Sequence, residues 1–396
     1  MKAHKRLLSL LLTAVMFTAT LVFSGGNVYA QAATVTNEAE LLLALGDSSV
    51  DTITVTGDIR LQDQTAIDRA LTIKGNGKII TENLTVGSSG NLTVTESLDI
   101  ESVDNAIYVE GGTLTLSGNA TLSASEGIPL VALGFEGSRS VINVKGGTIS
   151  GSYYAIMAFY TDINVTGGAI TGSSYGLTLF NEAKAKITGG TVRATGTLPD
   201  DAAILSDSSY IYISGTADIS ASTALATNLT SITIERTPSL KLSGSVYGVK
   251  EDLENIATYL TQLPKPVTAQ AGKAQSFSIV GADSGVKYKL LNPPSALEAS
   301  ISSNKVSLSP TKAGNYTLNL YYELDEGSSI RLILPVTVNA ASGNSSSGGT
   351  SSNTESRPEN PETGALPVLP MFTFFGFTVL AAVGALGYKA YAKRSR

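Results

Sequence analysis

A short glycine-rich sequence recurs through the middle of the chain at an almost constant interval. Val144–Ile149 (VKGGTI) is followed by Val165–Ile170 (VTGGAI) and by Ile187–Val192 (ITGGTV), at offsets of 21 and 22 residues. An earlier copy is assigned to Val109–Leu114 and a degraded later copy to Ile213–Ile219. A repeat of this length cannot bury its apolar face alone, so the pattern predicts units that stack on one another.

A second element keeps step with the glycine pairs: a small residue followed by an aliphatic one. Apolar and polar residues alternate, as in Ile163-Asn164-Val165, and glycines suit tight corners where a branched side chain would clash. We therefore expect an all-β parallel solenoid of about nine coils between Ile53 and Leu242, with Ile156 and Leu177 facing its interior. The paired elements are Ala106-Ile107, Gly127-Ile128, Ala155-Ile156, Gly176-Leu177, Ala203-Ile204 and Ala224-Leu225.

Each end of such a stack exposes strand edges and apolar core unless another element covers it. Glu38–Leu45 (EAELLLAL), with Thr36-Asn37 as its N-cap, predicts a helix over the first coil. Val249–Leu263 predicts a second capping helix, because apolar residues share one helical face: Leu253, Ile256, Ala257 and Leu260. A β-sandwich with coincidental repeats is the alternative fold.

The N-terminus has the layout of a secretory signal peptide over residues 1–30. Lys2, Lys5 and Arg6 precede an apolar run, and Val28 and Ala30 frame a V-Y-A processing site. We expect a signal peptidase to cleave after Ala30, which leaves Gln31 as the new N-terminus. An uncleaved membrane anchor is the alternative, although the apolar run is short for a span.

The C-terminal part reads as a tether followed by a membrane span. Residues 341–359 are rich in Gly, Ser, Asn and Thr and predict a disordered linker. Residues 370–388 form an uncharged apolar stretch long enough to be a transmembrane helix. The basic residues of 389–396 would hold the tail on the cytoplasmic side.

Asn360-Pro361-Glu362-Thr363-Gly364 lies between tether and span, and this order resembles the cell-wall sorting signal of Gram-positive sortase substrates. The resemblance implies that a sortase attacks the carbonyl of Thr363, releases Gly364 onward and joins the protein to peptidoglycan. The common pattern begins Leu-Pro, so Asn360 leaves the sortase class open. A simple C-terminal membrane anchor with a chance P-E-T-G is the alternative.

The repeats, corners and caps of residues 31–263 together resemble the pectate-lyase-like right-handed parallel β-helix of bacterial surface adhesins. Beyond Pro264 the repeats stop, and alternating strands over 264–340 resemble a small immunoglobulin-like β-sandwich of surface stalks. A spacer role is expected for that part. Its predicted strands are Ser276–Val280, Lys287–Leu291, Lys305–Leu308, Tyr316–Tyr322 and Ile330–Val338.

The composition restricts the available chemistry. There is no cysteine, and the only histidine, His4, lies in the predicted leader, so disulfides, thiolate metal sites and imidazole acid–base chemistry are excluded. We expect no metal site and no cofactor; calcium between loops is the alternative, although the sequence contains no D-x-D-x-D-G run. Of 27 basic residues, three leave with the leader and four lie in the tail, so the displayed part has 20 bases against 33 acids. This negative charge disfavours nucleic acid as a partner.

The sequence therefore predicts a non-catalytic display protein anchored to the cell wall, either an adhesin or a structural surface element, whose partner is a glycan or a protein. The alternative is a wall-anchored carbohydrate-active enzyme, a polysaccharide lyase or glycoside hydrolase. Such enzymes use clustered acids with a base, or paired carboxylates on neighbouring coils. Asp200-Asp201 is the only adjacent acidic pair in the coils, and we interpret it as a solvated loop.

Aromatic residues fall in phase on two neighbouring coils. At the 21-residue offset Phe159 superposes on Phe180, and Tyr154 on Tyr175. If Ile156 faces inward, alternation places Phe159 outward, with Tyr160 in the following turn. The flank that bears Phe159, Tyr160 and Phe180 is therefore the candidate ligand face, and an aromatic stack that only stabilises the coils is the alternative.

Overall fold

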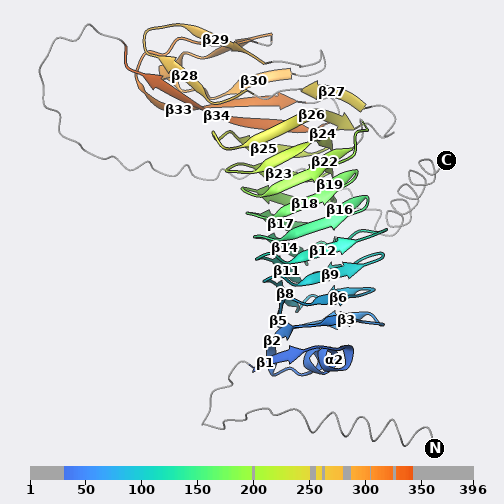
Figure 1. Cartoon of the computed structure of the whole chain (residues 1–396). Coiled ribbons are helices and arrows are strands. Elements are labelled where there is room, and N and C mark those ends of the chain that lie inside the picture. The colour runs from blue at the N-terminus through green and yellow to red at the C-terminus, as the bar shows by residue number, and fades with distance from the viewer. Residues whose placement is uncertain are drawn as a thin grey trace, which may run out of the picture. The chain divides into compact units, whose positions relative to one another are not determined.

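The computed structural model describes residues 31–198, 201–249, 256–260, 264–279, 287–303, 305–323 and 327–341. Within these ranges the chain is all-β apart from the helix α2 (Glu38–Gly46) and the 3-10 turn η1 (Ser295–Leu297). A long stack of parallel strands comes first, and a group of mostly antiparallel strands follows it (Figure 1). The predicted parallel β-helix is confirmed.

Sheet A forms one side of the β-helix from ten parallel strands, one from each coil, slightly more than the nine coils expected. At the usual interstrand spacing, ten stacked strands rise about 43 Å. In stacking order its strands are β1 (Gln31–Val35), β2 (Val50–Val55), β5 (Ala70–Gly75), β8 (Asn91–Val94), β11 (Thr113–Leu116), β14 (Ser140–Val144), β17 (Thr161–Val165), β20 (Lys184–Ile187), β23 (Tyr210–Ile213) and β25 (Ser231–Glu235).

Sheet B forms the remaining sides and consists of two ribbons of parallel strands, because each coil bends between them. The first ribbon stacks β3 (Asp58–Arg60), β6 (Lys78–Ile80), β9 (Asp99–Ser102), β12 (Thr121–Ala124), β15 (Thr148–Gly151), β18 (Ala169–Gly172) and β21 (Thr191–Ala194). The second stacks β4 (Thr65–Ile67), β7 (Leu84–Val86), β10 (Ile107–Glu110), β13 (Leu130–Leu133), β16 (Tyr154–Phe159), β19 (Tyr175–Phe180) and β22 (Ala202–Asp207). Two longer strands, β24 (Asp218–Asn228) and β26 (Lys241–Val249), continue both ribbons.

The core fills the space inside the coils. Ile142, Ile149 and Ile156 come from the three sides of one coil and are all fully buried. Ile156 lies in register with Leu177 on the next coil, which is also fully buried, so the predicted inward positions of both are confirmed. Each such side chain contributes about 1.5–3 kcal/mol by its removal from water.

The glycine pairs form the corner between sheet A and the first ribbon. Gly147 has φ +75°, and an added Cβ would lie 2.2 Å from the carbonyl oxygen of Ala120 on the coil before it. No side chain fits there, which explains why glycine recurs at this corner. Thr148 pairs with Ala169, and Ala169 pairs with Thr191, so the 21- and 22-residue offsets are confirmed as the coil period.

Two assignments within the repeat are wrong. Gly111-Gly112 turns from the second ribbon into sheet A, since Leu114 pairs with Ile142 of β14, so this pair lies at a different corner from Gly147. The same motif occurs at both corners for a steric reason. A Cβ on Gly112 would also lie too close to a backbone oxygen, at 2.3 Å, so both corners require glycine. In the second element Leu130, not Ile128, pairs with Ile156.

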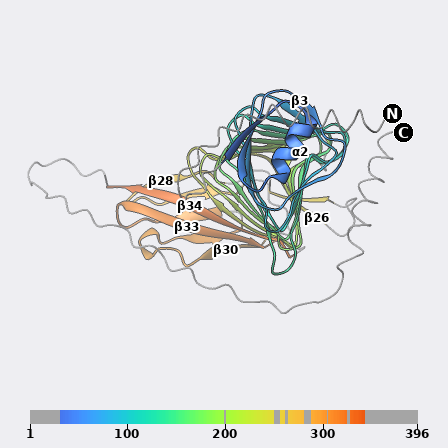
Figure 2. The same cartoon turned by 90° about the horizontal axis from the view of Figure 1, so that it is seen from below.

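Helix α2 lies across the first coil, where the sequence predicts a capping helix (Figures 1 and 2). The side chain of Asn37 accepts a hydrogen bond from the Glu40 N–H at 3.1 Å, and Glu40 in turn accepts from the Thr36 N–H at 2.9 Å. The first bond satisfies a backbone donor of the first helical turn, and the second holds the residue before the N-cap. Leu41 and Ala44 are the buried residues of the helix and cover the open end of the core.

The C-terminal strands form two sheets. In the larger, β33 (Gly314–Glu323) lies between β30 (Lys287–Leu291) and β34 (Ser329–Asn339), and β28 (Val267–Gln270) pairs with the far end of β34. In the smaller, β32 (Lys305–Leu308) lies between β29 (Gln275–Ser278) and β31 (Ser300–Ser302). All five strands predicted here are confirmed, with small shifts of their ends, whereas β28 and β31 had not been predicted.

The predicted second capping helix is wrong where the structure describes it. Ile256–Leu260 is the strand β27, antiparallel to β26, while residues 250–255 and 261–263 lie outside the described ranges. The last coil strand in sheet A, β25, is covered by β34, which pairs with it in parallel from Ser231↔Ser329 to Glu235↔Ile333. A strand satisfies the backbone groups of the last coil, which a helix laid across it could not.

Candidate functional site

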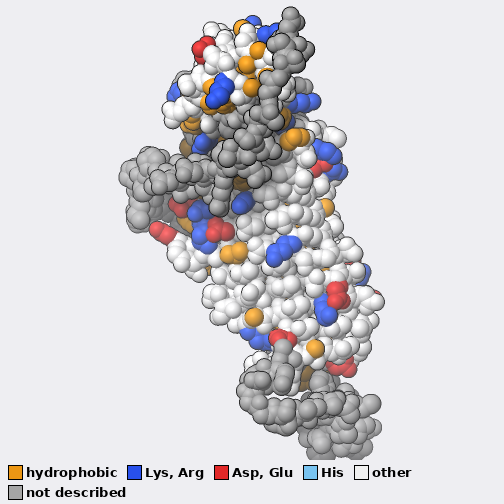
Figure 3. Space-filling view, turned by 90° about the vertical axis from the view of Figure 1, so that its left-hand side faces the viewer, with side chains coloured by type: hydrophobic (Ala, Val, Ile, Leu, Met, Phe, Trp, Pro, Cys, Tyr) orange, Lys and Arg blue, Asp and Glu red, His pale blue; other side chains and the backbone are white. Residues whose placement is uncertain are grey.

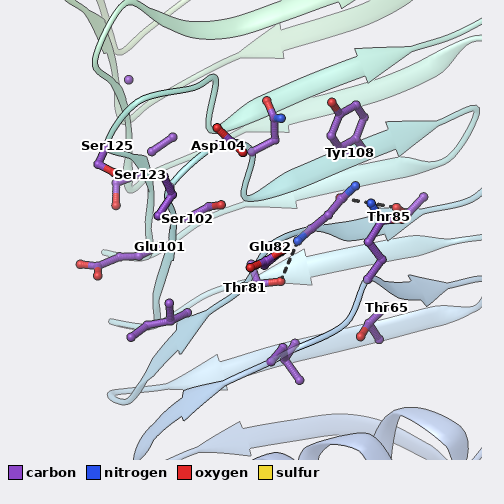
Figure 4. A pocket seen from close by; sticks show the side chains of 18 of the residues that line it. Thr65, Thr81, Glu82, Thr85, Glu101, Ser102, Asp104, Tyr108, Ser123 and Ser125 are labelled. Atoms are coloured by element: carbon purple, nitrogen blue, oxygen red, sulfur yellow. Dashed lines mark hydrogen bonds between the residues drawn. The ribbon is translucent and has the colours of Figure 1, made fainter.

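A polar cleft lies outside the bend between the two ribbons of sheet B. It has a volume of about 1410 Å³ and extends from Arg60 in β3 to Ser150 in β15. The corners that join the ribbons, such as residues 81–83 and 103–105, form part of its floor and walls (Figure 4). Hydroxyl and amide side chains dominate the lining: Thr81, Asn83, Thr85, Ser102, Ser123 and Ser125.

The floor of the polar cleft contains buried polar side chains. Thr81, Asn83 and Ser102 are 3%, 8% and 6% exposed. The Thr81 hydroxyl accepts from the Asn83 backbone N–H at 3.1 Å, and the Thr85 hydroxyl donates to Asn83 Oδ1 at 3.5 Å (Figure 4). Ser102 Oγ has no hydrogen-bond partner within the described residues. A buried hydroxyl without a partner costs free energy, so a ligand that bonds it gains affinity.

The rim of the polar cleft is acidic. Glu82, Asp104 and Glu110 line it with exposed side chains, and none takes part in an ion pair within the described part of the chain. Burial raises the pKa of the Tyr108 phenol, and the carboxylates of Asp104 and Glu110 raise it further. The negative potential of the rim therefore extends to the tyrosine on the same wall.

The lining of the polar cleft carries little positive charge. Arg60, at one end, is the only basic residue among those that line it. Glu101 is also in the lining but points away from Glu82 and Asp104 (Figure 4). Its carboxylate pairs with Lys78 at 2.8 Å, and Lys78 also approaches Asp99 at 3.5 Å. The hydrogen bond that the Lys78 ammonium donates to the Glu101 carboxylate is the main cause of the raised pKa of Lys78.

Three tyrosines gather just beyond the end of the polar cleft that Ser152 lines. Tyr154 stacks on Tyr175 with ring centroids 5.1 Å apart, and Tyr153 meets both rings edge-on, at 4.6 and 5.7 Å. They form a small apolar cluster outside the main core, in which Tyr175 is buried and the other two are half-buried. Tyrosine combines a large apolar ring with a polar hydroxyl group, which is why it is enriched at interfaces.

The candidate ligand face is only partly accessible. Phe159 and Phe180 are in register, as the offset predicts, and their rings stack at 5.0 Å. Phe159 is 8% exposed, while Phe180 and Tyr160 are half-buried. Phe159 is absent from the main core, consistent with its outward direction, yet little of its ring meets solvent. This burial favours the stabilising stack, and ligand binding by these residues stays a prediction.

Asp201 and the acids near the coil corners are engaged in separate local contacts within the described residues. Asp201 is buried rather than solvated, because its Oδ2 accepts the Leu198 N–H at 2.8 Å inside its own loop, and Asp200 lies outside the described residues. Asp162 pairs with Arg139 at 2.8 Å, and Asp218 with Arg193 at 3.2 Å. In the part of the chain that the structure describes, no group of three or more acids could hold a metal ion.

The polar cleft was not predicted from the sequence, although a signal for it exists. Glu82, Asp104 and Glu126 follow one another at 22-residue intervals, which is the coil period, so acids recur at one corner. Glu126 is exposed, and its backbone N–H bonds to the carbonyl of Val103 on the coil below. In contrast, the charged side chains that are visible on the face shown in Figure 3 are scattered.

The predicted processing and anchoring sites lie outside the described residues, except for Gln31 at the start of β1. These are Ala30, the sortase motif Asn360–Gly364, the linker 341–359 apart from Ala341, and the segment 370–388. No helix among the residues that the structure describes is long and apolar enough to cross a membrane.

Residues 32–197 match the model of a family described as a pectate lyase-like adhesive domain. The matched region runs from β1 to the end of β21 and contains every residue that lines the polar cleft. A search of curated proteins found no relative of the chain. The similarity supports the pectate-lyase-like β-helix, and the description of the family fits an adhesive role at a surface.

Proposed function

We propose that this chain is a non-catalytic cell-surface adhesin, whose β-helix presents the polar cleft to a glycan or protein on another surface. One observation carries the proposal: the region similar to an adhesive domain contains the whole cleft, from Arg60 to Ser152. A long cleft with a polar floor offers many modest contacts, which suits adhesion by an extended partner.

The proposal extends to attachment at the cell wall of a Gram-positive bacterium. Signal peptidase would release Gln31 as the N-terminus, and a sortase would cut between Thr363 and Gly364 and join Thr363 to peptidoglycan. The strands of 264–340 would act as an immunoglobulin-like spacer between wall and β-helix. The order of export signal, repeat domain, polar tether, sorting motif and apolar segment supports this arrangement.

Attachment is tested with Thr363→Ala, which removes the residue that the sortase would acylate and leaves the apolar segment intact. The full chain should then move from a wall fraction released by muramidase to a membrane fraction released by detergent. Glu362→Gln is the matched control, because it changes a position next to the cut without removing the acylated residue. Unchanged fractionation of the Thr363 variant would rule out sortase anchoring.

Adhesion is tested with cells that display the full chain, compared with cells that lack it, on glycan and protein surfaces. We expect saturable adhesion without release of sugar fragments. The alternative, a wall-anchored polysaccharide lyase or glycoside hydrolase, predicts soluble products from at least one polysaccharide. Turnover that persists in purified protein would replace the adhesin proposal with the enzyme, whereas absence of adhesion to every surface would contradict it.

A further inference from the structure

The charge of the polar cleft restricts the ligand that it can accept. Glu82, Asp104 and Glu110 have no basic partner within the described residues, and Arg60 stands alone at one end. A ligand with many carboxylates or sulfates would place like charges against this rim, which is unfavourable. A ligand with positive charges would instead form ion pairs with these carboxylates.

A second observation, independent of the rim, points to a ligand with hydrogen-bonding groups. Ser102 is 6% exposed, lines the cleft and has no partner for Oγ within the described residues. Figure 4 shows its hydroxyl on the floor between Glu82 and Asp104, which come from successive coils. A sugar hydroxyl or amine can both donate to and accept from such a group, so its entry would satisfy the buried oxygen.

The geometry favours a sugar chain over a peptide. The cleft crosses five stacked strands, from β3 to β15, so a ligand that fills it is extended over about 19 Å. A peptide usually binds along a β-surface by pairing with a free strand edge. Here β7, β9, β10 and β12 each pair with a strand on both sides, so no edge is free in the middle of the cleft.

We propose that the polar cleft binds a polysaccharide whose sugars carry protonated amino groups, with the amines against Glu82, Asp104 and Glu110. The ring faces of such a chain would reach Tyr108 inside the cleft and the cluster of Tyr153 and Tyr154 at its end. An ammonium group close to the Tyr108 ring also gains a cation–π contact. This inference rests on the proposed adhesin function and names the class of ligand for the same cleft.

The test uses the full chain, purified in detergent, with three probes of equal length titrated by calorimetry at low salt. The probes are a hexamer of β-1,4-linked glucosamine, the same hexamer fully N-acetylated, and a hexamer of galacturonic acid. We expect the glucosamine hexamer to bind with the highest affinity and its binding to weaken as salt is added. Equal affinity for the acetylated hexamer, or preference for the galacturonate, would overturn the proposal.

Substitutions of the rim acids test whether the ligand binds in the polar cleft. Glu82→Gln combined with Asp104→Asn should weaken glucosamine-hexamer binding roughly tenfold, the size expected for two partly exposed charge pairs. The matched control is Glu136→Gln, an exposed acid outside the cleft without an ion pair among the described residues. If the double variant folds and binds like the wild type, the ligand does not lie in this cleft and the proposal fails.

Ser102→Ala separates a ligand contact from a structural role. Removal of an unpaired buried hydroxyl should leave the melting temperature unchanged or slightly higher, whereas affinity for the hexamer should fall severalfold. A lower melting temperature with unchanged affinity would contradict a contact between Ser102 and the ligand. Adhesion of displaying cells to other surfaces, without hexamer binding, would reject this inference and leave the adhesin proposal intact.

Discussion

The backbone N–H of Thr230 donates a hydrogen bond to the hydroxyl of Ser328, at 3.1 Å and across 98 residues of sequence. This hydrogen bond lies one residue before the parallel pairing of β25 with β34, through which the C-terminal strands continue sheet A of the β-helix. The last coil and the larger C-terminal sheet therefore share one set of backbone hydrogen bonds. We expect the two parts to stabilise each other.

Leu332→Ala tests this coupling. Leu332 is fully buried in β34 and pairs with Ile234 on one side and Leu320 on the other. Its truncation should lower the free energy of unfolding by about 2–5 kcal/mol. Hydrogen exchange followed by mass spectrometry should show faster exchange in β25 as well as in β34. Thr337→Ala, at an exposed position of the same strand, is the control, and faster exchange in β34 alone would contradict the coupling.

Gly147→Ala tests the steric reason for the repeat. Gly147 has φ +75°, and the new Cβ would lie 2.2 Å from a backbone oxygen, so both strain and overlap oppose the change. Gly137 has φ +85° with nothing within 4 Å of its Cβ position, so Gly137→Ala adds strain alone, about 1–2 kcal/mol. Thermal melts should show a clearly larger loss for Gly147→Ala. Equal losses would mean that backbone strain alone selects glycine.

The aromatic pair of the candidate ligand face gives a prediction that separates stability from binding. Phe159→Ser removes a ring that is 8% exposed and stacked on Phe180, so we expect a lower melting temperature, equivalent to about 3 kcal/mol. Tyr160→Ser, at the half-buried turn position, should change stability far less. If Phe159→Ser instead abolished adhesion at a constant melting temperature, the sequence-based hypothesis of a ligand face would be correct.

At Arg236, unlike at the positions above, we expect a substitution not to destabilise the protein. Its side chain is 7% exposed, burial lowers the pKa of its guanidinium, and Nε and Nη1 have no partner within the described residues. Arg236→Met keeps much of the apolar stem and removes an uncompensated charge, so the free energy of unfolding should stay the same or increase. Urea denaturation measures this, and a loss above about 1 kcal/mol would show that the guanidinium is paired in solution.

Much of the β-helix follows from the sequence because two constraints repeat together. Alternation decides which side of a strand faces the core, and the coil period decides which residues stack, so Ile156 and Leu177 were placed correctly. The glycine pairs predicted the corners of the coils less reliably. Gly112 and Gly147 obey the same steric requirement at different corners, and the motif alone cannot tell one corner from another.

The end of the β-helix and the polar cleft were harder to predict, for different reasons. Ile256, Ala257 and Leu260 fit one face of a helix, but the unpaired edge of β26 offers them hydrogen bonds as a strand, and that long-range partner leaves no local signal. The cleft is formed partly by corner residues, such as Glu82 and Asp104, where alternation stops. Only the recurrence of Glu82 and Asp104 at the coil period indicated it.

The position of β34 determines how the protein would respond to a pulling force. The chain leaves β34 at Asn339 towards the segment that contains the predicted wall anchor, so tension between the wall and a bound surface would act along this strand. β34 lies between β25 and β33 and is bonded to both over many residues. A load along the strand direction must shear these bonds together rather than open them one at a time, which resists extension under flow.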